Sequence, residues 1–223
     1  MKLKQSYVGL LLLGLVPMCF AGIPATTQYV DTQVAGVQSQ IDAINSNPAI
    51  AHPVGSCYGG GVVYYVNPDA NAAAGQRGLI VSLTDAGTPS TYAWGPNPTD
   101  PVINTSAKYF TGLQNTVNIE ARSTADFPAA NAANSYTSTA TCDTCTPWYL
   151  PAQDELATLY FQSTNVTNFG TACAGYSAPS NVNAYWSSTQ SDANNAWGVG
   201  FGSGSVGFGF LNGTFRVRPV RAF

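Results

Sequence analysis

Residues 183–223 read NAYWSSTQSDANNAWGVGFGSGSVGFGFLNGTFRVRPVRAF, and this stretch decides the fold. Hydrophobic alternation restarts three times in it, in residues 196–201, 205–211 and 214–222. The last two runs are separated by Asn212-Gly213, a pair that supplies the two positive-φ positions of a tight hairpin turn. We therefore predict a three-stranded antiparallel meander, which the segment YWSST at residues 185–189 opens.

The preceding chain predicts a further hairpin and two helices. Gly60–Val66 and Gly78–Leu83 are apolar runs bounded by turn residues, so we expect them to pair as an antiparallel hairpin. An Ala/Asn-rich stretch, residues 123–135, predicts a first helix that Pro128 interrupts. Pro151 begins a clearer helix, with acidic residues near its positive end. A hairpin, two helices and then strands indicate an α+β fold.

The first 21 residues have the pattern of a signal peptide. Lys2 and Lys4 precede a short apolar run, residues 8–16, and Ala21 supplies the small residue before the expected cleavage site. The apolar run is short for a membrane anchor. We therefore expect an exported protein that is periplasmic, on the cell surface or extracellular, with no membrane insertion after cleavage.

Few residues of the chain are charged, and the balance is acidic. Charged residues make up 9% of the 223 residues. Without Lys2 and Lys4, six basic residues remain against eleven acidic ones, which gives a net charge of −5. Phosphate binding needs a concentrated basic surface, so the composition argues against a nucleic-acid partner.

Four cysteines follow the predicted signal peptide: Cys57, Cys142, Cys145 and Cys173. In an oxidising compartment they can form two disulfides, with three possible pairings. The C-x-x-C at 142–145 lies in a Thr-rich stretch without a thioredoxin-like βαβ pattern, so we favour a local structural bridge over a redox motif. A zinc site would need a second C-x-x-C, which the sequence lacks, and we expect no metal.

A helical neck is predicted at residues 22–48, where apolar residues recur at spacings of four and three. The seam consists of Val30, Val34, Val37, Ile41 and Ile44. All five residues are β-branched, which shifts a coiled coil from two strands toward three or more, so we expect a homotrimer. The alternative is an amphipathic helix packed on its own domain. We expect a connector at 49–56 and a single domain at 57–223.

Several motifs of the predicted domain resemble one bacterial family. They are CYGGGVVYYV at 57–66, GLIVS at 78–82, WYLP at 148–151, DEL at 154–156, YWSST at 185–189, AW at 196–197 and RVRPVR at 216–221. In this order, from about Cys57 to Phe223, they resemble the C-terminal domain of the Legionella collagen-like adhesin. The resemblance implies a C-type-lectin-like fold and, as in that adhesin, a trimer that binds sulfated glycosaminoglycans. This chain has no collagen-like Gly-X-Y tract before the domain, and its acidic balance disfavours a polyanion.

The candidate ligand-binding residues lie in the terminal stretch. They are Arg216, Arg218, Arg221, Ser187, Asn194 and Asn195. Guanidinium groups suit sulfate or carboxylate ligands, and a three-fold axis would gather nine arginines. In the structural alternative, Arg216 and Arg218 share one strand face, which is either a solvated face or a face that pairs with Asp154 and Glu155.

Catalysis is not expected, and neither is a cofactor. The one histidine, His52, lies in the predicted connector, so a Ser-His-Asp or Cys-His arrangement within the domain has no base. Three hypotheses remain. The chain is an exported adhesin that binds a glycan or another host or bacterial surface ligand, a structural trimeric surface or matrix protein, or a hypervariable receptor-binding protein of a diversity-generating element. The last rests on loop asparagines, whose codons are adenine-rich.

Overall fold

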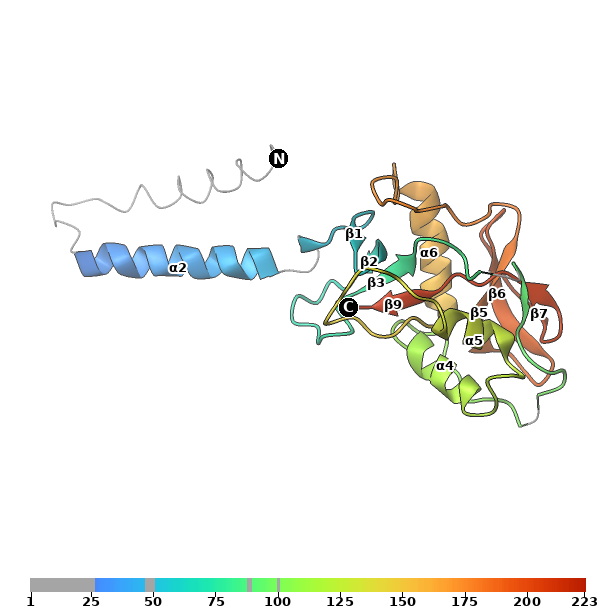
Figure 1. The fold of residues 1–223 in the computed structure, drawn as a ribbon. Helices are drawn as coiled ribbons and strands as arrows, with labels where there is room; N and C mark the ends of the chain where they lie inside the picture. Colours follow the sequence, from blue (N-terminus) through green and yellow to red (C-terminus); the bar gives the residue numbers. More distant parts are fainter. Residues whose placement is uncertain (1–26, 47–50, 88–89, 100) are drawn as a thin grey trace. The chain divides into compact units, whose positions relative to one another are not determined.

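The computed structural model describes residues 27–46, 51–87, 90–99 and 101–223 (Figure 1). The predicted signal peptide, residues 1–21, lies outside the described residues. The chain divides into an N-terminal unit, described here as one helix, and a compact unit that comprises residues 47–223. Within the described ranges, no helix has both the length and the apolar character needed to cross a membrane.

The helix predicted for the neck is present as α2, Thr27–Ser46. The side chains of Val30 and Ile44 lie outside the described part. Val34 is 61% exposed, and Val37 and Ile41 are partly exposed, so this apolar seam is accessible within a single chain. The coiled coil and its trimer stay predictions.

The first sheet has four strands in the order β1-β2-β3-β9. Its members are β1 (Cys57–Tyr58), β2 (Gly61–Val66), β3 (Gly78–Ser82) and β9 (Val220–Ala222). The hairpin predicted from the apolar runs is confirmed, because β2 and β3 pair antiparallel with Val62 opposite Val81. The end of the chain adds β9 to this hairpin, with Arg221 opposite Ile80.

The second sheet has three antiparallel strands in the order β5-β6-β7. They are β5 (Ala184–Gln190), β6 (Asn195–Gly200) and β7 (Ser205–Phe210). The first two runs of the predicted meander therefore pair as expected, with Trp197 opposite Phe208.

The structure corrects the prediction for the third strand of the meander. Residues 214–222 do not continue along β7 but divide into β8 (Thr214–Phe215), which pairs with β4 (Tyr92–Ala93), and β9, which pairs with β3. Two contacts explain the change of direction. Phe215 stacks on Trp186 at a centroid distance of 4.1 Å, and the Arg216 N–H donates to Ala184 O on β5.

Three helices of the compact unit lie wholly within its described residues: α4 (Gly112–Glu120), α5 (Pro128–Asn134) and α6 (Gln153–Asn165). The two predicted helices correspond to α5 and α6, and the prediction missed α4. The sequence of α4, GLQNTVNIE, has a weak apolar stripe, so its periodicity did not reveal it. Pro128 begins α5 rather than interrupting it, since proline fits the first turn of a helix.

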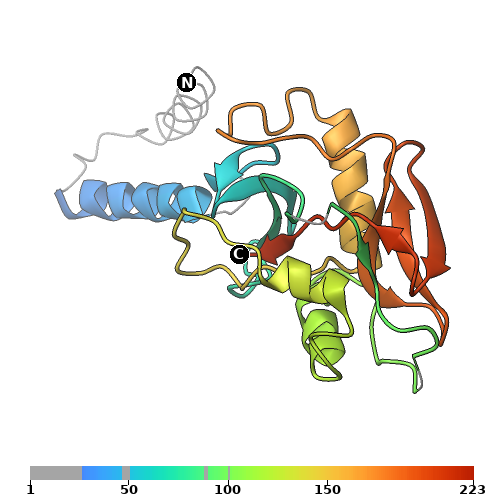
Figure 2. The same ribbon diagram turned by 45° about the vertical axis from the view of Figure 1, so that its right-hand side comes forward.

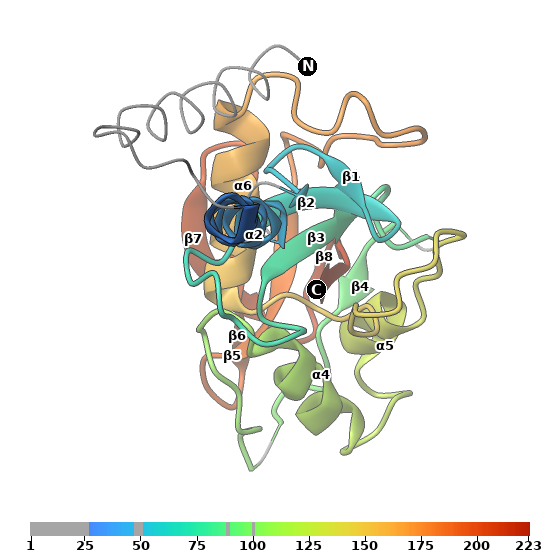
Figure 3. The same cartoon turned by 90° about the vertical axis from the view of Figure 1, so that its left-hand side faces the viewer.

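Helix α6 lies between the two larger sheets, as Figures 1 and 2 show. Its buried residues Leu156 and Leu159 join a core formed with Val62 of β2 and Val199 of β6. A second core contains Trp94, Trp186 and Leu211. Helices α4 and α5 lie side by side at one end of the compact unit (Figure 3).

Two disulfides join the four cysteines that follow the predicted signal peptide. Cys57 bonds to Cys173 across a sequence separation of 116 residues. Cys142 bonds to Cys145, which confirms the local bridge predicted for the C-x-x-C. The long-range bridge ties β1 to the loop after α6.

Candidate functional site

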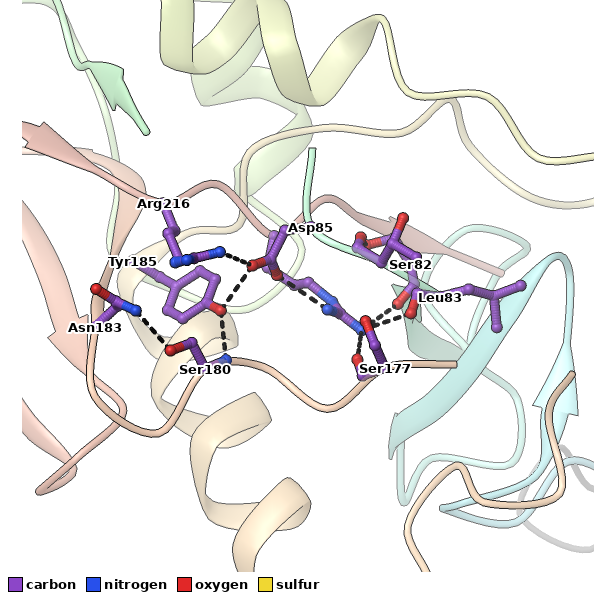
Figure 4. Close-up of polar contacts among 10 residues, drawn as sticks. Ser82, Leu83, Asp85, Ser177, Ser180, Asn183, Tyr185 and Arg216 are labelled. Carbon is purple, nitrogen blue, oxygen red and sulfur yellow. Dashed lines mark hydrogen bonds and ion pairs between the residues drawn. The ribbon is translucent and has the colours of Figure 1, made fainter. Parts of the chain in front are cut away.

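Two of the three candidate arginines converge on Asp85, a residue that the sequence analysis did not single out. Arg216 Nη1 donates to Asp85 Oδ2 over 3.0 Å, and Arg218 Nη1 donates to Asp85 Oδ1 over 2.9 Å. Figure 4 shows Arg216 and Tyr185 reaching Asp85 from the same side. The strand expected to carry both arginines is interrupted, because β8 ends at Phe215 and Arg216 forms only an isolated bridge with Tyr185, yet both guanidinium groups face Asp85. The alternative pairing with Asp154 and Glu155 is wrong, because both guanidinium groups form ion pairs with the loop residue Asp85 instead.

Arg218 has no exposed surface. Its Nη2 donates to the carbonyl oxygens of Ser82 and Ser177 over 2.8 Å and of Leu83 over 3.1 Å. The guanidinium therefore holds together β3 and the loop after α6. A side chain this enclosed does not reach a ligand, so the structure places Arg218 in the framework rather than in a binding surface.

Tyr185 completes the network around Asp85. Its hydroxyl donates to Asp85 Oδ2 over 2.9 Å and accepts from the Ser180 N–H over 2.7 Å. Burial raises the pKa of Tyr185, and the Asp85 carboxylate adds to this rise. At neutral pH the phenol thus stays a donor. The network joins β5, the segment before β9 and two loops, so its role is to hold these parts of the fold together.

Arg221 lies apart from this network, on β9. Its Nε donates to Thr146 O over 2.9 Å, its Nη1 donates to Gly59 O over 3.1 Å, and its guanidinium lies over the Trp148 ring at 5.0 Å. Desolvation lowers the pKa of Arg221. The three arginines therefore do not form one patch on a single chain. Arg216, whose side chain is 29% exposed, is more accessible than Arg218.

The candidate loop at residues 187–195 is held by its own side chains. Ser187 is fully buried, and its Oγ donates to Trp197 O over 2.8 Å, so it is not positioned to contact a ligand. Asn195 Nδ2 donates to both carboxylate oxygens of Asp192 over 3.0 Å. Asn194 is exposed, and its N–H donates to Asp192 Oδ1 over 2.8 Å. Of these three candidates, Asn194 is the most accessible.

A groove of about 440 Å³ lies beside α6, away from the predicted arginine site. Its lining combines aromatic rings with polar side chains: Tyr65, Tyr109, Asp154, Ala157, Thr158, Phe161 and Gln162. Tyr65 and Tyr109 stack with their ring centroids 4.7 Å apart. The Tyr109 hydroxyl also hydrogen-bonds to Thr158 on the helix. The groove therefore has a fixed aromatic wall facing hydrogen-bonding groups.

Glu155 is buried beneath this groove and holds its parts together. Its carboxylate accepts from the Ala152 N–H over 2.8 Å, before α6, and from the Gly112 N–H over 3.4 Å, at the start of α4. Burial raises the pKa of Glu155 to about 7, although the N–H donors of Ala152, Gly112 and Phe110 oppose the rise. Phe110 adjoins Tyr109, so Glu155 fixes the loop that carries the aromatic wall.

The close approach of α4 to Glu155 depends on glycine. A Cβ at Gly112 would lie 2.4 Å from Glu155 Oε2 and 2.8 Å from the Ala152 backbone nitrogen. The DEL motif therefore has two roles: Asp154 lines the groove, and Glu155 positions it. The sequence pattern identified these carboxylates, but it did not indicate Tyr65 and Tyr109, whose exposure in one groove depends on the packing of β2 against α6.

A second hollow, of about 520 Å³, lies next to the Asp85 network. Its lining is mostly polar: Thr84, Asp85, Gly87, Tyr92, Pro128, Asn131, Ala132, Ser135, Tyr136 and Thr137. Both hollows thus include a carboxylate, and neither lining includes an arginine or lysine. Among the described residues, no cluster of three or more His, Cys, Asp or Glu side chains could hold a metal ion.

Comparison with known protein families adds to this geometry. The family model of the Lcl C-terminal domain matches residues 97–221, which is more than half of the chain. The chain belongs to the Lcl C-terminal domain family. The matched region of this Lcl C-terminal domain includes Tyr109, α6, the terminal strands and all three arginines, whereas Tyr65 and Asp85 precede it.

Comparison with solved structures finds a fimbrial protein from Bacteroides ovatus, which is 17% identical with a TM-score of 0.48. The match covers 78% of this chain and 45% of the fimbrial protein, so the chain spans less than half of that protein's length. No curated protein matches the chain at a significant level.

Proposed function

We propose that this member of the Lcl C-terminal domain family is an exported, non-enzymatic surface protein that binds a glycan through a C-type-lectin-like domain. Membership of the family and the two disulfides support export and a surface role. The observation that carries glycan binding is the groove in which the stacked rings of Tyr65 and Tyr109 lie with the polar side chains of α6.

The chemistry of this groove fits a sugar ring. A pyranose has faces of C–H groups and a rim of hydroxyl groups. Aromatic faces carry partial negative charge and accept the C–H faces by stacking, while carboxylate and amide groups accept or donate hydrogen bonds at the rim. Tyr109 and Phe161 are both exposed, and Asp154 and Gln162 supply the polar groups. The groove volume of about 440 Å³ is within the usual range for small-ligand sites.

The charges favour a neutral or amino-bearing sugar in this groove. Asp154 would repel sulfate groups, and an ammonium group on a sugar would instead pair with it. The alternative ligand, a sulfated glycosaminoglycan, depends on the arginines, of which Arg218 is buried and Arg221 is bonded to backbone carbonyls. The groove is therefore our preferred site.

The test is glycan binding by the full chain and by groove variants. Recombinant protein is screened on a glycan array, and the best neutral or amino-bearing hit is titrated by calorimetry. We expect Tyr109→Ala and Asp154→Asn each to weaken binding at least about tenfold, since each removes a stacking surface or a desolvated hydrogen bond.

Matched controls keep the groove intact. Val117→Ala shortens an exposed apolar side chain on α4, and Asp143→Asn removes an exposed carboxylate from the C-x-x-C loop. Both should bind as the parent does. If the groove variants bind normally and Arg216→Ser does not, the site lies at Arg216 and not in the groove. An array without hits at low salt would contradict the glycan proposal.

A further inference from the structure

Strand β7 is the free edge of the three-stranded sheet. It pairs with β6 along its whole length, from Ser205 opposite Gly200 to Phe210 opposite Asn195. Among the described residues, the one backbone bond that β7 makes beyond β6 is the turn bond from the Gly213 N–H to Phe210 O. The Ser205 N–H donates to Ser203 Oγ over 3.3 Å, so the unpaired N–H and C=O groups of the other edge belong to the part of the strand that follows Ser205.

The side chains of β7 are apolar and exposed on one face. Val206, Phe208 and Phe210 alternate along the strand and are 43%, 62% and 66% exposed. Phe208 is held edge-to-face against Trp197 on β6, at a centroid distance of 5.8 Å. Soluble proteins commonly protect such an edge with lysine, proline or a bulge. Strand β7 reads SVGFGF and has none of these residues.

The other sheet edges in the described part of the chain are short or occupied. Strands β1, β4 and β8 have two residues each, and β9 has three. The outer edge of β5 is covered, because the Trp186 N–H donates to Arg216 O and the Ser188 N–H donates to Pro151 O. Among the described strands, therefore, the long, uncharged edge that β7 can pair with is β7 of a second copy of the chain.

We propose that two copies of the chain associate through antiparallel pairing of their β7 strands across a two-fold axis. The pairing joins two three-stranded sheets into one of six strands, and the exposed apolar faces of both β7 strands become continuous. A two-fold contact is self-complementary, so an uncharged edge meets an uncharged edge without an unpaired charge. This interface is separate from the seam of α2 and from the groove.

The two-fold symmetry predicts which residues of the two β7 strands lie opposite each other. Antiparallel pairing about a two-fold axis must keep each apolar side chain on its own face, so the axis passes through a residue and not between two residues. The greatest overlap of the strands Ser205–Phe210 places the axis at residue 207 or residue 208. One of these residues then lies opposite its own copy, with the Cβ atoms about 5 Å apart. A Cβ at Gly207 meets no atom within 4 Å in the single chain, so a cysteine fits there.

Two experiments on the full chain test the proposal. First, light scattering compares the parent with Phe208→Lys and with the control Phe161→Lys, whose ring on α6 is 59% exposed. We expect Phe208→Lys to halve the mass of the species formed at high concentration and Phe161→Lys to leave it unchanged. Equal masses for the parent and Phe208→Lys would overturn the proposal.

Second, cross-linking works whether or not the lysine variant folds. Under mild oxidation, Gly207→Cys or Phe208→Cys should form a disulfide-linked pair of chains at least about tenfold faster than Val182→Cys, whose parent side chain is 82% exposed in a loop. Equal rates at all three positions would refute the pairing. Loss of liposome binding in Phe208→Lys without a change of mass would point to a lipid surface instead and would also refute it.

Discussion

Asp85 Oδ1 lies 2.9 Å from Arg218 Nη1, and the Arg218 side chain has no exposed surface. This ion pair is the centre of a network that also includes Arg216 and Tyr185. Removing one partner of a buried pair leaves an uncompensated charge, which is strongly destabilising. We therefore expect Asp85→Asn to lower the free energy of unfolding by about 3 kcal/mol. Urea denaturation measures this change, and Asp126→Asn, at an exposed position, should change it little.

The two arginines of this network should differ in importance. Arg218→Met removes four hydrogen bonds and a buried charge, whereas Arg216→Met removes one hydrogen bond from a side chain that is 29% exposed. We expect the loss of stability to be at least about 2 kcal/mol larger for Arg218→Met. Equal losses in urea denaturation would mean that Arg218 is not the main structural arginine.

Glu155 should make the stability of the protein depend on pH. Its pKa is raised from 4.5 to about 7 by burial, so the folded state binds a proton more tightly than the unfolded state does. The resulting stability is present below pH 4.5 and is lost as the pH rises through 7, by on the order of 3 kcal/mol. Glu155→Gln should flatten this dependence between pH 5 and 8. Urea midpoints across this range test it, and a variant with the same slope as the parent would exclude Glu155 as the cause.

The long-range disulfide should contribute more stability than the local one. Cys57–Cys173 closes a loop of 116 residues, and Cys142–Cys145 closes a loop of three. Loop entropy predicts a loss of about 5 kcal/mol for the double Cys57→Ala, Cys173→Ala variant and a much smaller loss for the local bridge. Thermal unfolding of both double variants gives the order, and a reversed order would count against the assigned pairing.

We expect the apolar seam of α2 to hold the predicted trimer together. In a Phe208→Lys background, so that pairing of β7 does not contribute, Val34→Asn with Ile41→Asn places polar groups in the seam. We expect the mass to fall from three chains to one. Ser39→Asn, at an exposed position of the same helix, is the control. A monomer before any seam substitution would show that α2 is not a trimerising neck.

Local sequence patterns predicted much of the fold. Alternating apolar residues marked the hairpin at Gly61–Val66 and Gly78–Ser82, and Pro151 with two acidic residues marked the start of α6. The C-x-x-C indicated its own bridge. Each of these features depends on residues close together in the chain, whose backbone preferences act before any tertiary contact forms.

The partners of the arginines could not be predicted in the same way. Arg218 and Asp85 are 133 residues apart, and the sequence placed acidic residues of the DEL motif as the nearer candidates. Glu155 instead accepts hydrogen bonds from backbone N–H groups at two helix starts. Which carboxylate an arginine meets depends on how the loops cross, and composition carries no information about that.

The sequence by itself determined the family, the α+β class, most strands and the local disulfide, because periodicity and turn residues act over a few positions. Tertiary structure alone decided that residues 214–222 divide between two sheets, that Arg218 is buried on Asp85, and that Tyr65 and Tyr109 form the wall of a groove. Those outcomes follow from long-range packing, in which the burial of Trp186 under Phe215 and of Glu155 beneath the Tyr109 loop outweighs local preference.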